Sequence, residues 1–537
     1  MSLAVIIAVW QLKRYLSAST ALDNIPGPPG ASWVFGSIIE LFNPDAWGFH
    51  DRIAQEYGSI VRVKGAFGSN QLYVYDPSVV HHIVAKEQDV FGQPDWFVEG
   101  MKNLFGNCLL TTHGREHSHL RKIINPIFSN TQMRELAPIF HAVGRKVQQS
   151  LIMKANEKPT KVDMLSWMTR LSLELVGKAG LGYTFDDLTD NSVEHPYEQA
   201  AKQLAGSYSQ NAFLRTIITP KITTIGSPAF RKFVVEHMPL KFVQEMRRIV
   251  QVMHNTSIDI FKSKKALIHW EGQNVSRNGK GSDIITALMR ANVTASTIDK
   301  LADDEVISHI NLLAFAATDT TASALCRVIH TLALHQDVQV KLREEIRQAR
   351  KISGEQGFTH DEIMSLPLLD AVIKETLRLY PPTVTTQRTA RRDTVLPLAT
   401  PIQGINGDAI SHIDVPKGTT IVVSIIGSNR NQTIWGVDSQ EWKPERWLQP
   451  LPESLINARV PGVYSHMMTF LAGVRACVGF KFAELEMKVV LALLVEALEF
   501  SLGTDTIIWH MNAIAQPYLE SNSNAPTMPI LITVAKA

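Results

Sequence analysis

The residue with the clearest chemical potential is Cys477, which stands in the segment Phe470-Leu-Ala-Gly473-Val-Arg475-Ala-Cys477-Val-Gly479. In the pattern F-x-x-G-x-R-x-C-x-G, each fixed position has a purpose if the cysteine is a thiolate ligand to haem iron. The sulfur is a soft anionic ligand that favours O–O cleavage. Gly473 and Gly479 let the backbone fold closely around the sulfur and aim N–H groups at it. Phe470 is expected to shield the sulfur from water, and Arg475 to pair with a haem propionate. The alternative is a buried structural cysteine in a glycine-containing turn.

This segment resembles the cysteine loop of the cytochrome P450 family, the haem-thiolate monooxygenases, and the resemblance extends from about residue 25 to the C-terminus. It implies a mostly α fold with a minor β part, a single large domain in which a long central helix passes over a haem b. It also implies dioxygen, an apolar small-molecule substrate and electrons from an NADPH-cytochrome P450 reductase. The chain is expected to be a monomer of the eukaryotic microsomal type, similar to fungal members.

A second pattern is Ala316-Ala317-Thr318-Asp319-Thr320-Thr321. An aspartate inside an apolar helix is costly unless it is hydrogen-bonded, so the pattern is either a stabilised polar patch or a functional pair. It resembles the family's I-helix motif, A/G-G-x-D/E-T-T, with Ala317 in place of the usual glycine. The resemblance gives Asp319 and Thr320 the catalytic acid and alcohol positions, which relay the protons that dioxygen consumes.

Glu375-Thr-Leu-Arg378 places an acid and a base on one helix face. An exposed pair of this kind would contribute little stability. The surrounding sequence resembles the family's K helix, whose third partner corresponds to Arg446 in Lys443-Pro-Glu-Arg446-Trp447. We therefore expect a buried structural network beneath the cysteine loop, with no chemical step of its own.

The propionates of a haem require donors, and the resemblance offers His117, Arg121, Arg388 and Arg475. The segment around His117 and Arg121 resembles the W-x-x-x-R of the C helix, with a histidine in place of tryptophan. That exchange keeps a ring N–H donor but introduces an imidazole that titrates. Three lysines near these segments are predicted to dock an acidic reductase, unless they form an ordinary solvated face: Lys122, Lys481 and Lys488.

Hydrophobic periodicity predicts which elements position these residues. Period-two alternation indicates strands at 60–64 and 71–75, and a closing strand at 528–534. Helical periodicity marks 134–154, 166–180, 239–265 and above all 301–335, a helix apolar on most sides. This last helix is expected to begin near Asp303 or Asp304, whose carboxylates cap it and complement its dipole. A polar, glycine-rich surface loop is predicted at 270–283.

The motifs favour one large domain, although a length of 537 residues would by itself suggest three or four. Residues from about 117 to 477 must converge on one cofactor. A formal charge of +2 gives no indication of a nucleic-acid partner. Three cysteines form no disulfide framework, which suits a reducing compartment.

We expect the chain to have three parts. Residues 1–24 form a short membrane-anchor or interfacial segment, residues 25–30 a proline-rich hinge, and residues 31–537 the monooxygenase domain. The apolar run at 3–10 is shorter than the roughly 20 residues that span a bilayer, so a signal-peptide core or a soluble terminus are alternatives. By resemblance, residues 212–230 also touch the membrane. We expect the protein to be located at the endoplasmic reticulum membrane, with its catalytic domain facing the cytosol.

Two rival functions remain open at this stage: a haem-thiolate isomerase or dehydratase that uses no dioxygen, and a non-catalytic haem-binding protein. The Asp319–Thr320 pair argues against both. The segments expected to line the pocket, 96–112, 205–216, 312–320 and 382–387, are apolar. They suit a terpenoid, sterol, fatty acyl or polycyclic aromatic substrate equally well.

Overall fold

The structure, a computed structural model, describes residues 21–536 apart from 157, 191, 211–225, 274–282, 295–299 and 354–356. Helix accounts for 57% of the chain and strand for 14%, which confirms the predicted mostly α fold with a minor β part. The predictions for residues 1–20 and for most of 212–230 lie outside the described residues.

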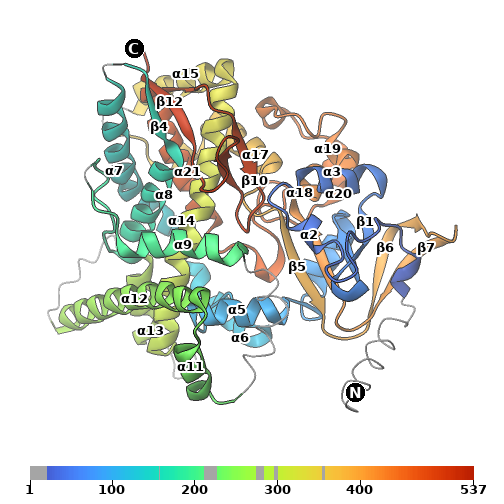
Figure 1. Cartoon of the computed structure of the whole chain (residues 1–537). Coiled ribbons are helices and arrows are strands. Elements are labelled where there is room, and N and C mark those ends of the chain that lie inside the picture. Colours follow the sequence, from blue (N-terminus) through green and yellow to red (C-terminus); the bar gives the residue numbers. More distant parts are fainter. Residues whose placement is uncertain are drawn as a thin grey trace.

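The helices are α2 (Ile38–Leu41), α3 (Trp47–Glu56), α4 (Pro77–His81), α5 (Asp95–Phe105), α6 (Gly114–Ile124), α7 (Asn130–Ala155), α8 (Met164–Leu175), α9 (Pro196–Gln210), α11 (Pro228–His237), α12 (Lys241–Gln273), α13 (Ile284–Thr294), α14 (Asp303–Leu334), α15 (Gln336–Ser353), α16 (His360–Met364), α17 (Pro367–Leu379), α18 (Ile425–Asn429), α19 (Gln432–Trp435), α20 (Glu453–Ala458) and α21 (Phe480–Ala497). The long helices gather on one side of the molecule (Figure 1). Because α12 continues to Gln273, the first residues of the loop predicted at 270–283 are helical, and residues 274–282 of that prediction lie outside the described residues.

The strands are β1 (Ile60–Lys64), β2 (Asn70–Val74), β3 (Phe91–Gly92), β4 (Thr160–Asp163), β5 (Thr385–Ala390), β6 (Thr394–Gln403), β7 (Ala409–Val415), β8 (Thr420–Ser424), β9 (Leu498–Leu502), β10 (Ile507–His510), β11 (Gln516–Leu519) and β12 (Pro529–Val534). The largest sheet has the order β1-β2-β8-β5-β3. It lies beside the β6–β7 hairpin, away from the long helices (Figure 1). The predicted closing strand is β12, which pairs antiparallel with both β4 and β9.

Residues 21–30 pack on the large sheet. The N–H of Arg62 in β1 donates to the Pro26 carbonyl at 2.9 Å. A Cβ on Gly27 would lie 1.8 Å from the Arg62 carbonyl oxygen, so only glycine fits this approach. Leu22 and Ile25 are each only 1% exposed. The packed part of the chain therefore already includes residues that the sequence assigned to the anchor and the hinge.

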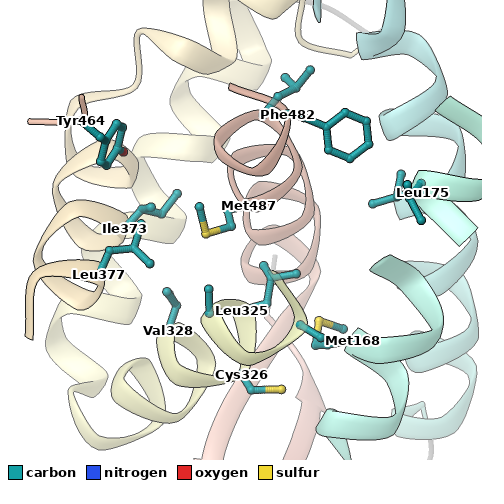
Figure 2. Packing of buried hydrophobic residues seen from close by; sticks show 14 of the residues in the cluster. Met168, Leu175, Leu325, Cys326, Val328, Ile373, Leu377, Tyr464, Phe482 and Met487 are labelled. Carbon is teal, nitrogen blue, oxygen red and sulfur yellow. The ribbon is translucent and has the colours of Figure 1, made fainter. Parts of the chain in front are cut away.

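Helix α14 runs through the centre of the helical side, and its 32 residues extend about 48 Å. Figure 2 shows where it is buried: Leu325 and Val328 of α14 meet Met168 of α8, Ile373 of α17 and Met487 of α21. The apolar residues around α14 thus pack against several helices and form part of the core. Within the described residues, α14 is the one helix long and apolar enough to cross a membrane, but 67% of its most apolar window is buried inside the protein.

The first turn of α14 is capped differently from the prediction. Its N-cap residue is Ala302, and the carboxylate that accepts the Ala302 N–H, at 3.0 Å, belongs to Glu305. Asp304 accepts the N–H of Glu305 at 3.0 Å, while Asp303 is the first helical residue. All three acids still complement the positive end of the helix dipole.

Candidate active site

The conformation of the cysteine loop, residues 470–479, requires a glycine at one position, Gly473. Gly473 has φ +66°, and a Cβ there would lie 2.0 Å from the carbonyl oxygen of Val84. Leu471, two residues earlier, also has a positive φ, +59°. A hydrogen bond from the Cys477 N–H to the Phe470 carbonyl, at 2.9 Å, joins the two ends of the loop. A side chain at 473 would push the loop off the segment that carries Val84, so glycine is required there.

At Gly479, unlike the prediction, the backbone has no conformation or close contact within the described residues that only a glycine could adopt. Its φ is −91°, and an added Cβ would meet only Phe128, at an ordinary 3.8 Å. No close approach among the described residues therefore requires a glycine at 479. Its backbone N–H donates to the sulfur of Cys477, as the sequence predicted for this loop.

Cys477 is an exposed residue, although many protein atoms surround its thiol group. Burial raises the pKa of its thiol, while the Gly479 N–H and the nearby Arg121 guanidinium oppose that rise. Helix α21 begins at Phe480, so the positive end of its dipole also favours an anion near the sulfur. The nearest aromatic neighbours of Phe470 are Tyr464, at 5.2 Å between ring centroids, and Phe480, at 6.2 Å.

Three guanidinium groups near this loop have no carboxylate partner within the described part of the chain: Arg121, Arg388 and Arg475. Arg121 donates to the Ala476 carbonyl at 2.6 Å. Arg388 donates to the Thr386 hydroxyl at 3.0 Å and the Gln387 carbonyl at 2.7 Å. Burial lowers the pKa of Arg388 and of Arg475 to about 10, and the mutual repulsion of the cations adds to the effect on Arg475. Such a group of cations without carboxylate partners among the described residues, one buried (Arg388) and two half-buried (Arg121 and Arg475), fits an anionic ligand with more than one charge.

His117 is 3% exposed, and burial together with Arg475 and Arg121 lowers its pKa to about 4. The imidazole is therefore neutral near pH 7 and does not titrate there, contrary to the expectation from the sequence. It remains able to donate one ring N–H. His113 also belongs to this cluster, because its Nδ1 lies 3.3 Å from a nitrogen of Arg475.

Helix α14 presents Asp319 and Thr320 to different surroundings. The Thr320 hydroxyl donates to the Ala316 carbonyl at 2.8 Å, four residues earlier on the same face. Ala316 is exposed and Thr320 partly exposed within this otherwise buried helix, so this face borders open space. Asp319 is buried, and no hydrogen bond joins its carboxylate to Thr320 in the described structure. The two adjacent residues therefore do not form a directly bonded pair.

Asp319 instead lies under the electrostatic influence of α9. Burial raises its pKa to about 6, with Lys202 opposing that rise and Glu198 adding to it. The Lys202 ammonium contacts Glu198 and Glu194, each at 2.7 Å. One oxygen of Asp319 and one of Glu198 are buried without a hydrogen-bond partner. Sequence reasoning did not single out these residues, although Glu198 and Lys202 of α9 stand four residues apart, which places them on one helix face, and Glu194 stands four residues before Glu198.

A second missed residue, His309, connects α14 to the cysteine loop. Its Nδ1 donates to the Glu305 carbonyl at 2.7 Å, which leaves Nε2 to accept the Leu109 N–H at 3.1 Å. The Leu109 carbonyl in turn accepts from Arg475 at 3.3 Å. This chain of contacts fixes the segment between α5 and α6 against both α14 and the loop.

Glu375 and Arg378 of α17 form an ion pair at 2.8 Å, with both side chains 0% exposed. Arg446 lies 3.5 Å from the same carboxylate, and the Trp447 indole N–H donates to it at 2.9 Å. Arg378 also donates to backbone carbonyls, those of Asn429, Ser439 and Glu441. The three predicted residues therefore come together in a buried network.

Lys488, one of the lysines predicted to dock a reductase, is 1% exposed. It pairs with Asp370 at 2.8 Å and donates to the Met364 carbonyl at 3.0 Å. The prediction is wrong for this residue, because α21 turns it into the core. Lys122 is exposed and Lys481 partly exposed.

A sequence model described as cytochrome P450 matches residues 26–516. The chain belongs to the cytochrome P450 family. It is similar to cytochrome P450 monooxygenase 212 of Postia placenta, 42% identical over 528 residues that cover 97% of this chain and 96% of that protein. It is also similar to a ganoderic acid synthetase of Ganoderma lucidum, 35% identical over 96% of this chain and 94% of that protein. The crystal structure of a cytochrome P450, CYP102L1, has the same fold, with a TM-score of 0.70 at 20% identity over 91% of this chain and 97% of that chain.

This cytochrome P450 is therefore a monooxygenase, and the family implies a haem cofactor. The residues present fit such a group. Cys477 offers a sulfur that already accepts a backbone N–H, as a thiolate ligand to iron would, and the guanidiniums of Arg121, Arg388 and Arg475, which have no carboxylate partner among the described residues, suit two propionates.

Proposed function

We propose that the protein is a haem b monooxygenase that inserts one oxygen atom from dioxygen into an apolar small molecule. The observation that supports it best is the cysteine loop, in which a sulfur with a backbone donor lies beside cations that have no acid partner. When bound, haem supplies the redox chemistry that activates dioxygen. The chain holds it through Cys477 and, at the propionates, through His117, Arg121, Arg388 and Arg475.

The residues of α14 manage protons in this proposal. Thr320 holds a hydroxyl on the open face of the helix, where its oxygen can accept a hydrogen bond from a water molecule and its O–H, once turned away from the Ala316 carbonyl, can donate one. Asp319, with a pKa of about 6, can both release and accept protons near neutral pH. Lys202 and Glu198 of α9 place charged groups between Asp319 and the surface.

We infer that electrons come from an NADPH-cytochrome P450 reductase, docked near the exposed Lys122. The enzyme works as a monomer on the cytosolic face of the endoplasmic reticulum membrane. Exposed apolar side chains support a membrane-facing surface, notably Trp33 (60% exposed), Ile39 (52%) and Phe42 (43%) near the N-terminus, and Phe230 (52%) and Phe233 (57%) on α11. The name of the Ganoderma lucidum relative supports a place in secondary metabolism.

The test is the spectrum of the reduced carbon monoxide complex. We expect wild type to show the red-shifted Soret band that an anionic sulfur produces, and Cys477→Ser to lose it. Cys326→Ser is the matched control, because Cys326 is buried in the core and should leave the band unchanged. An unshifted wild-type band, or a shifted band that survives in Cys477→Ser, contradicts the proposal.

NADPH consumption with reductase separates the rival functions. A monooxygenase consumes NADPH and dioxygen as product forms, whereas an isomerase or dehydratase forms product without either. A non-catalytic haem-binding protein forms no product.

A further inference from the structure

One face of α14 carries a row of residues that begins at the site and continues past it. Ala316, Thr320, Ser323, Arg327 and His330 follow one another at intervals of four, three, four and three, which keeps them on the same side of the helix. Ala316 and Thr320 border open space, as described above. The last three residues of the row contact a hairpin.

That hairpin consists of β10 and β11, and each of the three residues attaches to it. The Ser323 hydroxyl donates to the Ala515 carbonyl. The Arg327 guanidinium carbon lies 3.6 Å from the centre of the Trp509 ring. His330 accepts the Trp509 indole N–H at 3.0 Å. The first two residues of the α14 row thus serve the site, and the last three hold the hairpin.

The tip of the hairpin, residues 511–515, lies near the site. Ser323, which holds Ala515, is less than one helical turn beyond Thr320. From the other side, the Ala515 N–H donates to the Pro382 carbonyl at 2.8 Å, at the start of a segment expected to line the pocket. The tip therefore lies between α14 and the chain that leads into β5, where a bulky substrate extending past Thr320 would meet it.

Arg327 is an unusual residue to find in a buried contact with the hairpin. It is 9% exposed, and no carboxylate in the described part of the chain pairs with it. Its partners are the faces of Trp509, of Tyr380 at 4.3 Å and of Trp47 at 5.9 Å. Burying a charge without a counter-ion is costly, and a leucine would fill the same space without that cost. What the cation adds is a directional attraction to the Trp509 face, which fixes the position of β10.

We propose that Arg327 is a positioning residue that, through Trp509, sets how the hairpin tip at 511–515 closes on the substrate and so determines which bulky substrates the pocket accepts. This inference rests on the proposed haem site. It assigns no chemical step to Arg327, which acts only through the hairpin.

Azole binding to the ferric holoprotein tests this inference without a known substrate. Imidazole is too small to reach the tip, whereas bifonazole is bulky, and both are followed by the spectral shift on nitrogen ligation to iron. We expect Arg327→Met to bind imidazole like wild type and to weaken bifonazole binding about 3- to 30-fold, the effect of losing one cation–π contact. Trp509→Leu should do the same, and the double variant should be no weaker than either single one.

Arg327→Lys provides the conservative comparison, because it keeps a cation near the Trp509 face and should recover part of the bifonazole affinity. If Arg327→Met fails to accumulate, Arg327→Lys and Trp509→Leu still carry the test. Unchanged bifonazole affinity in these variants, or equal weakening of both azoles, overturns the inference. A lower melting temperature with unchanged bifonazole binding also overturns it, because the contact would then be only structural. Failure of the proposed function would instead appear in wild type, as a carbon monoxide complex without the red-shifted band.

Discussion

At the scale of single residues, Thr320 is distinguished from its neighbours by where its hydroxyl lies. Thr318 makes the same kind of bond, donating to the Ala314 carbonyl at 2.7 Å, but it is 3% exposed. The two threonines therefore form a matched pair in which only one borders open space.

We expect Thr320→Ala to bind haem and substrate, to accept electrons, and to release more hydrogen peroxide and less product per NADPH. The reason is that loss of one proton-donating contact slows the step it serves by about 10²–10⁴-fold, although a water molecule can compensate in part. NADPH, peroxide and product measured together give the coupling. Thr318→Ala should couple like wild type. If Thr320→Ala also does so, the threonine has only a structural role in the helix and the isomerase alternative gains support.

The buried carboxyl group of Asp319 is expected to make the stability of the protein depend on pH. Its pKa is about 6 in the folded protein against an ordinary value of 3.8, because burial disfavours the charged form. The folded state thus binds the proton more tightly, so this contribution to stability is complete below about pH 4 and is lost as the pH rises through 6. Its size is about 1–3 kcal/mol.

Asp319→Asn removes this titration. We expect the melting temperature of the variant to exceed that of wild type by more at pH 8 than at pH 5, because only the wild type carries the ionised buried group at pH 8. A gain of the same size at both pH values would show that Asp319 does not titrate in this range.

At the scale of elements, the network of α17 and the turn at 444–447 depends on both charges of Glu375 and Arg378. We expect Arg378→Ala to yield little haem-loaded protein, because the buried Glu375 carboxylate would keep only the longer contact with Arg446, and removing one partner of a buried ion pair costs about 3–5 kcal/mol. The measurement is the ratio of haem to protein after purification, together with the melting temperature.

Arg248→Ala is the control for that prediction. Arg248 pairs with Glu245 at the same three-residue spacing and the same 2.8 Å, but the two side chains are 52% and 43% exposed. Its loss should change little, because water screens an exposed pair. A fully loaded Arg378→Ala variant would mean that the buried network is peripheral to haem binding.

At the scale of the whole molecule, two truncations separate membrane association from folding. A chain that begins at Ala21 should move from the membrane pellet toward the soluble fraction and keep its carbon monoxide spectrum. A chain that begins at Ser32 should in addition be destabilised by about 3–6 kcal/mol, because it loses the buried Leu22 and Ile25. Sedimentation and melting temperatures provide the readouts. A full-length protein that is soluble without detergent would contradict the anchor.

Much of this protein was determined by local sequence patterns. Hydrophobic periodicity predicted α14 almost to the residue, because a helix buried on several sides must be apolar around most of its circumference. The spacing of Glu375 and Arg378 predicted their pairing, because a helix places residues three apart on one face. The cysteine pattern predicted the loop for the same reason: its requirements lie within ten consecutive residues.

The tertiary structure alone decided whatever depends on segments distant in the chain. The neutrality of His117 arises from burial and from Arg475, and the pKa of Asp319 is shaped by charges on α9. Lys488 became a core residue because α21 packs against α16 and α17. Gly473 is required by its contact with Val84, whereas Gly479 has no such neighbour. Burial and electrostatic fields are sums over elements brought together by folding, so no local pattern in the sequence contains them.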